Sequence, residues 1–477
     1  MLFSSGLFLF LFAAFAFFYG FMRRTPALRI WYVIAFSLYF YYKSSGIYLL
    51  LLVGVSVSDF WIGRAIAHVG SRRAQRALVA LSIAADLAVL GYFKYTNFFI
   101  EIARDLFGAG FLEFQNIFLP VGISFFVFQS MSYTIDIYRG QLKPLGNWCD
   151  YLFYLSFFPQ LVAGPIVRAR DFIPQIRRNP VVVTREMFGT GVFLILTGLF
   201  KKAIISDYIS LNFVDRIFDE PLLYSGFECL AGIYGYALQI YCDFSGYSDM
   251  AIGIALLLGF RFPKNFDAPY KSATITEFWR RWHISLSSWL RDYLYISLGG
   301  NRKGKLRTYG NLLVTMVLGG LWHGAAIRFI LWGTLHGVAL ALHKLWMAVV
   351  PGAKATGAQM HWWSRAAGVF FTFNLVCLGW LMFRAESMQT VELMLHQIFS
   401  NFNVPMIPQV IAGYAGVFAL IGAGYLLHLM PGCVDRAAQR LVANAPLVLQ
   451  VVMAAAMIWC VMQIKSSDIQ PFIYFQF

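Results

Sequence analysis

The stretch that decides the fold is "VTMVLGGLWHGAAIRF", residues 314–329. It overlaps a run of 20 residues, 308–327, that contains no Lys, Arg, Asp or Glu. A helix of about 20 apolar residues is long enough to cross the hydrocarbon core of a bilayer. One ionisable group, His323, lies near the middle of this predicted span. Because ionisable side chains at membrane depth are costly and usually functional, His323 is the first candidate for a role in chemistry.

The composition of the whole chain extends this prediction from one span to the entire protein. Of its 477 residues, 59% are hydrophobic and only 13% are charged, whereas soluble domains contain about 25% charged residues. Apolar runs recur from one end to the other, which predicts an all-α polytopic membrane protein embedded in a lipid bilayer. The net charge of +15 comes from Lys and Arg in short loops between these runs, as the positive-inside rule predicts, and not from a nucleic-acid-binding stripe. The six cysteines are scattered without a C-x-x-C pair, which argues against a disulfide framework or a cysteine metal site.

The apolar runs predict about 11 transmembrane helices, together with re-entrant and interfacial helices, in a single membrane domain that covers residues 1–477. The first run, residues 2–21, is followed by Arg23 and Arg24 and has no positive residue before it. This order is the reverse of a cleaved signal peptide, so we expect an uncleaved span with its N-terminus outside the cytoplasm. The basic loop 68–76 is then cytoplasmic, and the acidic loop 97–116 lies on the other side.

Three stretches do not fit one simple span each. Residues 151–167 contain "FFPQLVAGPIV", whose proline and glycine residues break a membrane helix, so we expect a re-entrant segment buried in protein. The apolar stretches 227–260 and 311–346 are too long for one crossing. Each is expected to hold a span with a bent or re-entrant piece, or two short spans.

Residues 274–307 predict an amphipathic helix. Thr274 and Glu277 have the spacing of a capping box. Large apolar residues then recur every three or four positions, which forms one apolar stripe of a helix: Phe278, Trp282, Leu286, Trp289 and Tyr293. Basic residues follow or flank this stripe, so the helix is expected at the cytoplasmic membrane interface, with His283 facing protein or the edge of a cavity.

Two further polar positions fall within apolar surroundings. Asp243, in "YCDFSGYSDM", is a carboxylate at predicted membrane depth and is expected to face a cavity or a partner. His336 fits either a hydrogen bond to a neighbouring helix or a functional role. His283, His323 and His336 are far apart in the sequence and lack a local H-E-x-x-H pairing, so no metal site is predicted.

Three motifs taken together resemble the membrane-bound O-acyltransferase (MBOAT) family. They are "FWRRWHISLSSWLRDYLYISLGGNR" at 278–302, "YCDFSGYSDMAIG" at 241–253 and "GGLWHGA" at 319–325. Within the family, the chain looks most like the bacterial branch that O-acetylates secreted exopolysaccharides such as alginate, with cellulose-acetylating relatives close to it. The resemblance implies an MBOAT fold, O-acetyltransferase activity and a multi-pass location in the bacterial inner membrane, with the N-terminus periplasmic.

The resemblance also implies roles for individual residues. His323, in the predicted span 311–328, matches the family's catalytic histidine, and His283 matches its second histidine. A neutral imidazole suits a general base that takes the proton of an attacking hydroxyl. Side chains near these histidines are expected to line or support a tunnel: Asp243, Trp322, Trp282, Ser285 and His336.

The same resemblance implies a donor and partners. No cofactor is expected to stay bound, and acetyl-CoA is the expected acetyl donor. Basic residues near the cytoplasmic face are candidates for attracting its phosphates: Arg280, Arg281, Arg302 and Lys303. The expected partners are a periplasmic acetyltransferase and a polysaccharide biosynthesis and export complex.

Two other classes of protein remain open from the residues alone. A proton-coupled transporter would also bury Asp and His at membrane depth. A structural subunit of a polysaccharide export complex would tolerate the loss of His323. Measuring acyl transfer by a His323→Ala variant separates both classes from an enzyme.

Overall fold

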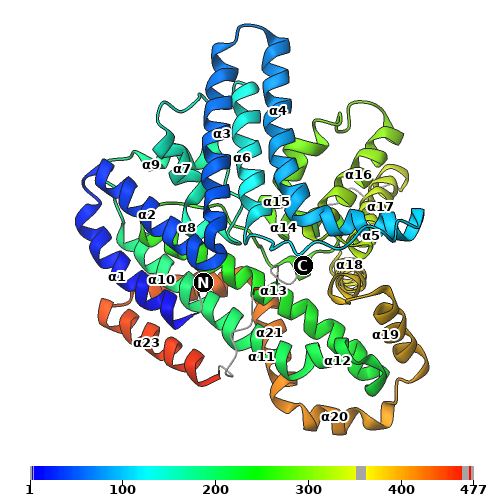
Figure 1. The fold of residues 1–477 in the computed structure, drawn as a ribbon. Helices are drawn as coiled ribbons and strands as arrows, with labels where there is room; N and C mark the ends of the chain where they lie inside the picture. Colours follow the sequence, from blue (N-terminus) through cyan, green and yellow to red (C-terminus); the bar gives the residue numbers. More distant parts are fainter. Residues whose placement is uncertain (1–2, 4, 351–360, 465–471, 474–477) are drawn as a thin grey trace. The chain divides into compact units, whose positions relative to one another are not determined.

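The protein was analysed as a computed structural model, which describes all residues except 1–2, 4, 351–360, 465–471 and 474–477. The described residues form helices and no strands, which confirms the predicted all-α class. They divide into two compact units, which we treat separately (Figure 1). Unit 1 comprises Met1–Ile195 and Met250–Pro263, and unit 2 comprises Leu196–Asp249 and Lys264–Phe477. That the chain is one membrane domain stays a prediction.

Unit 1 is built around a layer of long helices. Its helices are α1 (Gly6–Met22), α2 (Pro26–Ser45), α3 (Leu49–His68), α4 (Arg72–Leu90), α5 (Thr96–Phe107), α6 (Ile123–Tyr138), α7 (Trp148–Ser156), α8 (Phe158–Leu161) and α9 (Ala169–Ile176). Helices α3, α4 and α6 pack side by side, as Figure 1 shows. Helix α10 (Arg185–Leu199) and helix α13 (Gly226–Leu257) contribute residues to both units.

The centre of this layer holds a hydrogen-bonded polar cluster. Asp59 on α3 is 1% exposed and accepts a hydrogen bond from the Ser82 hydroxyl at 2.7 Å and another from Ser130. The Ser130 hydroxyl also lies 2.8 Å from the Tyr151 hydroxyl. Because each of these groups comes from a different helix, the cluster ties α3, α4, α6 and α7 together.

The predicted break in residues 151–167 is confirmed. Helix α7 ends at Ser156, the single turn α8 follows, and the chain after Leu161 leaves helical geometry. Residues 150–169 are buried throughout. Irregular backbone at membrane depth must be buried in protein, and this segment meets that requirement.

Unit 2 contains the candidate histidines. Its remaining helices are α11 (Asp207–Ile209), α12 (Asp215–Asp219), α14 (Ile275–Arg281), α15 (Ile284–Trp289), α16 (Lys305–His323), α17 (Ile327–Val349), α18 (Trp362–Arg384), α19 (Met388–Ser400), α20 (Ile407–Gly413), α21 (Ala415–Leu429), α22 (Gly432–Asn444) and α23 (Leu447–Ile464). Short π-helical segments follow α10 at Phe200–Ser206 and α15 at Leu290–Tyr295. Single π-turns occur frequently at functional sites.

Helices α16 and α17 form a closely packed pair. A Cβ atom added at Gly320 would lie 2.1 Å from the Phe329 carbonyl oxygen, and one at Gly333 would lie 2.3 Å from the Met316 carbonyl oxygen. Gly337 follows Gly333 at the four-residue spacing of a G-x-x-x-G motif. Small residues at this spacing let two helix backbones approach in a membrane. The glycines therefore set the distance between the two helices that carry His323 and His336.

The described helices have the apolar length that a membrane protein needs. Four helical stretches are long and apolar enough to cross a bilayer: Pro26–His68, Arg72–Phe107, Arg185–Asp219 and Trp362–Arg384. Two bent pairs, Val404–Gly413 with Ala415–Leu429 and Gly432–Asn444 with Leu447–Gln463, raise the number to six within the described part of the chain if each is one span. The predicted number of about 11 is not confirmed.

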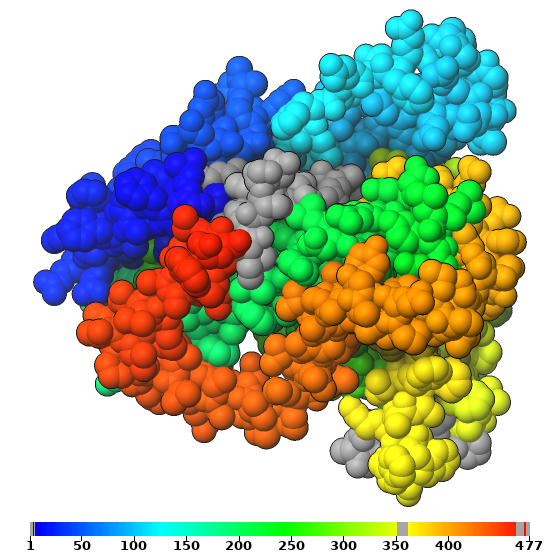
Figure 2. Space-filling model, turned by 90° about the horizontal axis from the view of Figure 1, so that it is seen from below, coloured from blue at the N-terminus to red at the C-terminus, as the bar shows by residue number. Residues whose placement is uncertain are grey.

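Large apolar side chains cover much of the surface of these helices. On α1, Phe10 and Phe21 are 72% and 73% exposed. Helices α22 and α23 lie at the surface of the face seen in Figure 2, in dark orange and red, and Leu441 and Val448 are 76% and 75% exposed there. Large apolar side chains exposed to this degree are typical of helices in contact with lipid.

Two predictions about helix continuity are wrong. The stretch 227–260 forms one continuous 32-residue helix, α13, without a bent or re-entrant piece. Residues 274–307 do not form one helix, because the chain breaks at Trp282 and His283 between α14 and α15. The stripe side chains are buried in protein, between 1% and 6% exposed. The periodicity therefore predicted correctly which side chains are buried, but it did not predict the interruption of the helix at Trp282 and His283.

Candidate active site

His323 is the last residue of α16, at the turn into α17, and not in the middle of a span as expected. It is 4% exposed. Three aromatic rings meet its imidazole edge to face, with ring centroids 5.0 Å away for Trp322, 5.1 Å for Trp332 and 5.3 Å for Phe383. These apolar walls exclude bulk water from the ring.

The turn after His323 explains the glycine in the "GLWHG" motif. Gly324 ends α16 with an extended backbone, and α17 begins three residues later at Ile327. A Cβ atom at Gly324 would lie 1.9 Å from the Phe329 ring. A larger residue would therefore push the turn away from Phe329 and move the imidazole next to it.

His283 lies in the break between α14 and α15 with a backbone φ of 42°. This left-handed conformation is uncommon for histidine. The side chain is fully buried, and Phe244 packs edge to face on its ring at a centroid distance of 4.6 Å. Burial lowers the pKa of His283 to about 3, so the ring is neutral at physiological pH.

Asn265 fixes the orientation of the His283 ring. Its side-chain oxygen Oδ1 accepts hydrogen bonds from the Ser285 backbone N–H at 3.2 Å and from the Ser285 hydroxyl at 2.9 Å. Its Nδ2 donates to the Ser248 hydroxyl at 3.0 Å. Because the backbone N–H can only donate, the atom facing His283 Nδ1 at 3.2 Å is an oxygen. His283 Nδ1 therefore carries the proton, and Nε2 carries the lone pair.

The tryptophans of the two histidine motifs lie beside the imidazoles. The Trp322 ring centroid is 6.1 Å from that of His283 and 5.0 Å from that of His323, so one indole contacts both rings. Trp282 is 1% exposed and packs on Trp380 at 4.8 Å. The structure thus brings the two predicted histidines into one aromatic cluster of unit 2.

Asp243 is held in an ion-pair cluster. Lys202 Nζ lies 2.5 Å from Asp243 Oδ1 and 2.8 Å from Asp207 Oδ1. Asp243 Oδ2 accepts a hydrogen bond of 2.9 Å from the backbone N–H of Ile473. Since Lys202 and Asp243 are at most 5% exposed, they neutralise each other away from water. The carboxylate therefore anchors the described residues near the C-terminus, next to the aromatic cluster.

The remaining predicted site residues divide into buried and exposed groups. His336 on α17 is fully buried and packs against Trp332 at a ring distance of 4.8 Å. Arg280, Arg302 and Lys303 are exposed. Arg281 is engaged by Glu277 at 2.8 Å. Three of the four predicted phosphate-binding side chains can thus reach solvent.

Residues that complete the site carried no recognisable sequence signal. Asn265 lies in a stretch without regular secondary structure, and Trp332, Phe383 and Lys202 lie within apolar runs. Only packing brings them to the histidines.

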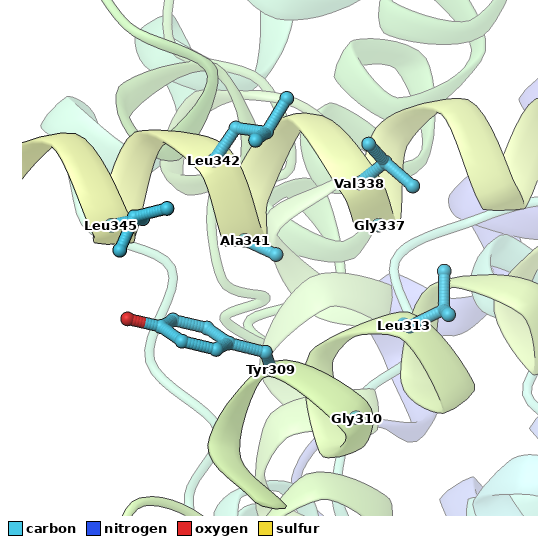
Figure 3. A pocket seen from close by; sticks show the side chains of 8 residues that line it. All are labelled: Tyr309, Gly310, Leu313, Gly337, Val338, Ala341, Leu342 and Leu345. Carbon is cyan, nitrogen blue, oxygen red and sulfur yellow. The ribbon is translucent and has the colours of Figure 1, made fainter. Parts of the chain in front are cut away.

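A groove also lies between α16 and α17, with a volume of about 300 Å³ (Figure 3). It is lined by apolar side chains and one tyrosine: Tyr309, Gly310, Leu313, Gly337, Val338, Ala341, Leu342 and Leu345. Leu342 and Leu345 are 59% and 45% exposed, and no candidate histidine lines the groove. Its chemistry suits an acyl chain of the surrounding lipid and not catalysis.

Comparison with known proteins identifies the chemistry that this geometry serves. The sequence profile of MBOAT, the membrane-bound O-acyltransferase family, matches residues 117–411, a range that includes both His283 and His323. The probable alginate O-acetylase AlgI of Pseudomonas syringae is 42% identical over 405 residues, which are 84% of this chain and 75% of that protein.

More distant relatives carry out related transfers. The peptidoglycan O-acetyltransferase of Helicobacter pylori is 36% identical over 420 residues, 82% of this chain and 78% of that protein. The teichoic acid D-alanyltransferase of Streptococcus thermophilus is 30% identical over 284 residues, 55% of this chain and 68% of that protein. Each of these proteins is named for the transfer of an acyl group. The chain belongs to the membrane-bound O-acyltransferase family and is a membrane O-acyltransferase.

Proposed function

We propose that this protein takes acetyl from cytoplasmic acetyl-CoA and passes it across the bacterial inner membrane for O-acetylation of a secreted exopolysaccharide. Alginate is the favoured polymer, because the probable alginate O-acetylases are 42% identical over most of this chain. A similar polymer such as cellulose would need the same chemistry. The observation that carries the proposal is His323, a buried imidazole enclosed by three aromatic rings within the family's matched region.

The proposed reaction needs a proton acceptor at the site of transfer. The new C–O bond joins the acetyl carbonyl carbon to the acceptor's hydroxyl oxygen, and the C–S bond of the thioester breaks. His323 accepts the hydroxyl proton as the bond forms and returns it to the departing thiolate. General-base catalysis of this kind contributes about 10²- to 10⁴-fold in rate.

Other groups have supporting roles in this proposal. His283, fixed by Asn265, contacts the same Trp322 ring as His323 and in this proposal lines the path to it. The exposed Arg280, Arg302 and Lys303 attract the donor's phosphates through their charge. A periplasmic acetyltransferase and a polysaccharide biosynthesis and export complex receive the acetyl group on the far side.

The proposal predicts that His323→Ala abolishes acetylation in cells. Wild-type and variant proteins would be produced at matched membrane levels in a strain that makes alginate but lacks its own acetylase, and alkali-released acetate would be measured per gram of polymer. We expect at least about a 100-fold loss for His323→Ala. His396→Ala is the control, since His396 is exposed on α19. Polymer that stays acetylated with His323→Ala would exclude this role for His323 and favour a transporter or a scaffold.

A further inference from the structure

The groove between α16 and α17 is open to the surface and almost wholly apolar (Figure 3). Three of its lining side chains, Val338, Leu342 and Leu345, are exposed on α17. Tyr309 carries the one hydroxyl group among the lining residues. A ligand that fills this groove must therefore be apolar over most of its length, and burial of its apolar surface stabilises the complex.

One end of the groove lies next to basic residues. Figure 3 shows Tyr309 and Leu345 opposite each other at this end. Lys305 and Arg307 precede Tyr309 at the start of α16, and both are exposed. Lys344 precedes Leu345 on α17 and is half-buried. Three cations therefore lie within about one helical turn of the residues that end the groove.

These three cations lack an acidic partner. None of them forms an ion pair with another described residue. Residues 293–385, which include α16 and α17, contain no Asp or Glu. The positive charge at the end of the groove is thus available to attract an anionic group from outside the chain.

An exposed tryptophan indicates where this end lies in the bilayer. Trp346 follows Leu345 and is 60% exposed. Tryptophan and tyrosine are enriched at the level of the lipid headgroups, and Lys and Arg are enriched on the cytoplasmic side. The groove is therefore expected to run from the headgroup level at Tyr309 into the hydrocarbon core at Leu313 and Val338.

The two features match the two parts of an anionic phospholipid. Its acyl chain is apolar along its length, and its phosphate oxygens accept charge-assisted hydrogen bonds from Lys and Arg. Clusters of basic residues beside membrane helices recognise anionic headgroups in this way. A free phosphate would leave the groove empty, and an apolar helix of a partner would leave the three cations without a counter-charge.

We propose that the groove binds one acyl chain of an anionic phospholipid, and that Lys305, Arg307 and Lys344 bind the headgroup of the same molecule. A zwitterionic headgroup carries a cation of its own, which these residues repel. The bound lipid contacts both α16 and α17, so it stabilises the pair of helices that carries His323. This inference depends neither on the acetyl donor nor on the polymer.

The test measures the dissociation constant of the first lipid bound by the purified protein, using native mass spectrometry from detergent micelles. Phosphatidylglycerol and phosphatidylcholine with the same oleoyl chains are titrated separately. For wild type we expect phosphatidylglycerol to bind at least about 10-fold more tightly. The double variant Lys305→Gln/Arg307→Gln should lose most of this preference and bind phosphatidylcholine as wild type does. Ala341→Phe, which fills the groove, should weaken the binding of both lipids.

Helix α22 supplies matched controls. Arg436→Gln/Arg440→Gln removes the same charge, and Ala437→Phe adds the same side chain, at exposed positions that do not line the groove. Both controls should bind the two lipids as wild type does. Thermal unfolding in detergent alone shows whether each variant is folded.

Three results would overturn the inference: equal binding of both lipids by wild type, an equal loss of preference in the α22 charge variant, or unchanged lipid binding by a folded Ala341→Phe. The variant of Lys305 and Arg307 changes exposed residues only, so its result decides the question even if Ala341→Phe does not fold. The same spectra report the mass of the assembly. A dimer that Ala341→Phe converts to a monomer would assign the groove to a second copy of the chain instead.

Discussion

At the scale of single residues, His283 shows how a strained backbone and a buried hydrogen bond define one protonation state. The residue has a φ of 42°, and its Nδ1 faces the Asn265 side-chain oxygen at 3.2 Å. Burial lowers its pKa to about 3. The ring is therefore neutral over the whole physiological pH range, and titration of this ring cannot switch the enzyme on or off near neutrality.

The lowered pKa of His283 makes a prediction about stability and pH. The unfolded chain binds a proton at this histidine below about pH 6.5, but the folded protein does not. Stability is therefore lost as the pH falls below that value, and lowering the pH from 7.5 to 5.0 should cost about 2 kcal/mol through this residue. Thermal unfolding in detergent would measure this loss for wild type and for His283→Asn.

The Asn variant is a suitable reference because asparagine accepts a left-handed backbone and does not titrate. We expect wild type to lose about 2 kcal/mol more stability than His283→Asn between these two pH values. Equal losses for the two proteins would show that His283 is not held neutral by burial.

The sequence identified some of these residues but not their surroundings. His323 and His283 stood out because imidazoles are rare among apolar and aromatic neighbours, and a short motif resembling a known family contained each. Asn265 and Lys202 could not be predicted, since the site residues that they meet in space, His283 and Asp243, are distant from them in the chain; His283 is 18 residues from Asn265. The sequence therefore indicated which residues were candidates, but not which partners they contact in the folded protein.

At the scale of helices, the glycines of the α16–α17 pair determine how the site is built. Helix α16 offers a matched comparison, because a Cβ atom at Gly320 would meet the Phe329 carbonyl oxygen at 2.1 Å, whereas one at Gly310 meets nothing within 4 Å. Backbone atoms cannot move aside as a flexible side chain can. Alanine substitutions at the two positions therefore distinguish the effect of helix packing, at Gly320, from the effect of helix propensity, at Gly310.

We predict opposite effects for alanine at these two positions. Gly310→Ala should raise stability by about 0.5–1 kcal/mol, because alanine is the better helix former. Gly320→Ala should lower it by about 1–3 kcal/mol and reduce acyl transfer, because the helices must separate near His323. Thermal unfolding and initial transfer rates would be measured together, and a Gly320→Ala protein as stable and as active as wild type would refute the packing role.

Helix boundaries show where reasoning from periodicity succeeds and where it fails. The break in residues 151–167 was predictable, because proline and glycine act locally on the backbone. The break at His283 was not, since the apolar stripe continues through it without a proline or glycine. The continuity of α13 was also not predictable. A helix that packs within protein can be longer than a bilayer is thick, and hydropathy alone does not show whether a long apolar stretch is one such helix or two spans.

At the scale of the whole molecule, the distribution of positive charge predicts how the chain lies in the membrane. The loop between α3 and α4 and the segment after α5 both contain exposed residues, including Ser71 and Glu113. The positive-inside rule places Ser71 in the cytoplasm and Glu113 in the periplasm. The all-α membrane class follows from composition, whereas the number of spans and their direction do not follow from the helices alone.

Cysteine labelling tests this orientation. In a background where the native cysteines are replaced, Glu113→Cys should react with a membrane-impermeant maleimide in intact spheroplasts. Ser71→Cys should react only after the membrane is made permeable. The opposite pattern would reverse the proposed orientation and place the N-terminus in the cytoplasm.

One measurement tests the central claim, that His323 carries out acyl transfer, most directly. Purified wild type, His323→Ala and the exposed control His396→Ala would each be mixed with radiolabelled acetyl-CoA and the acceptor partner, and label transfer would be followed through a single turnover. Wild type and His396→Ala should transfer label at the same rate, and His323→Ala should be at least about 100-fold slower with its fold intact. Equal rates for all three proteins would show that the chemistry takes place elsewhere and that His323 is structural.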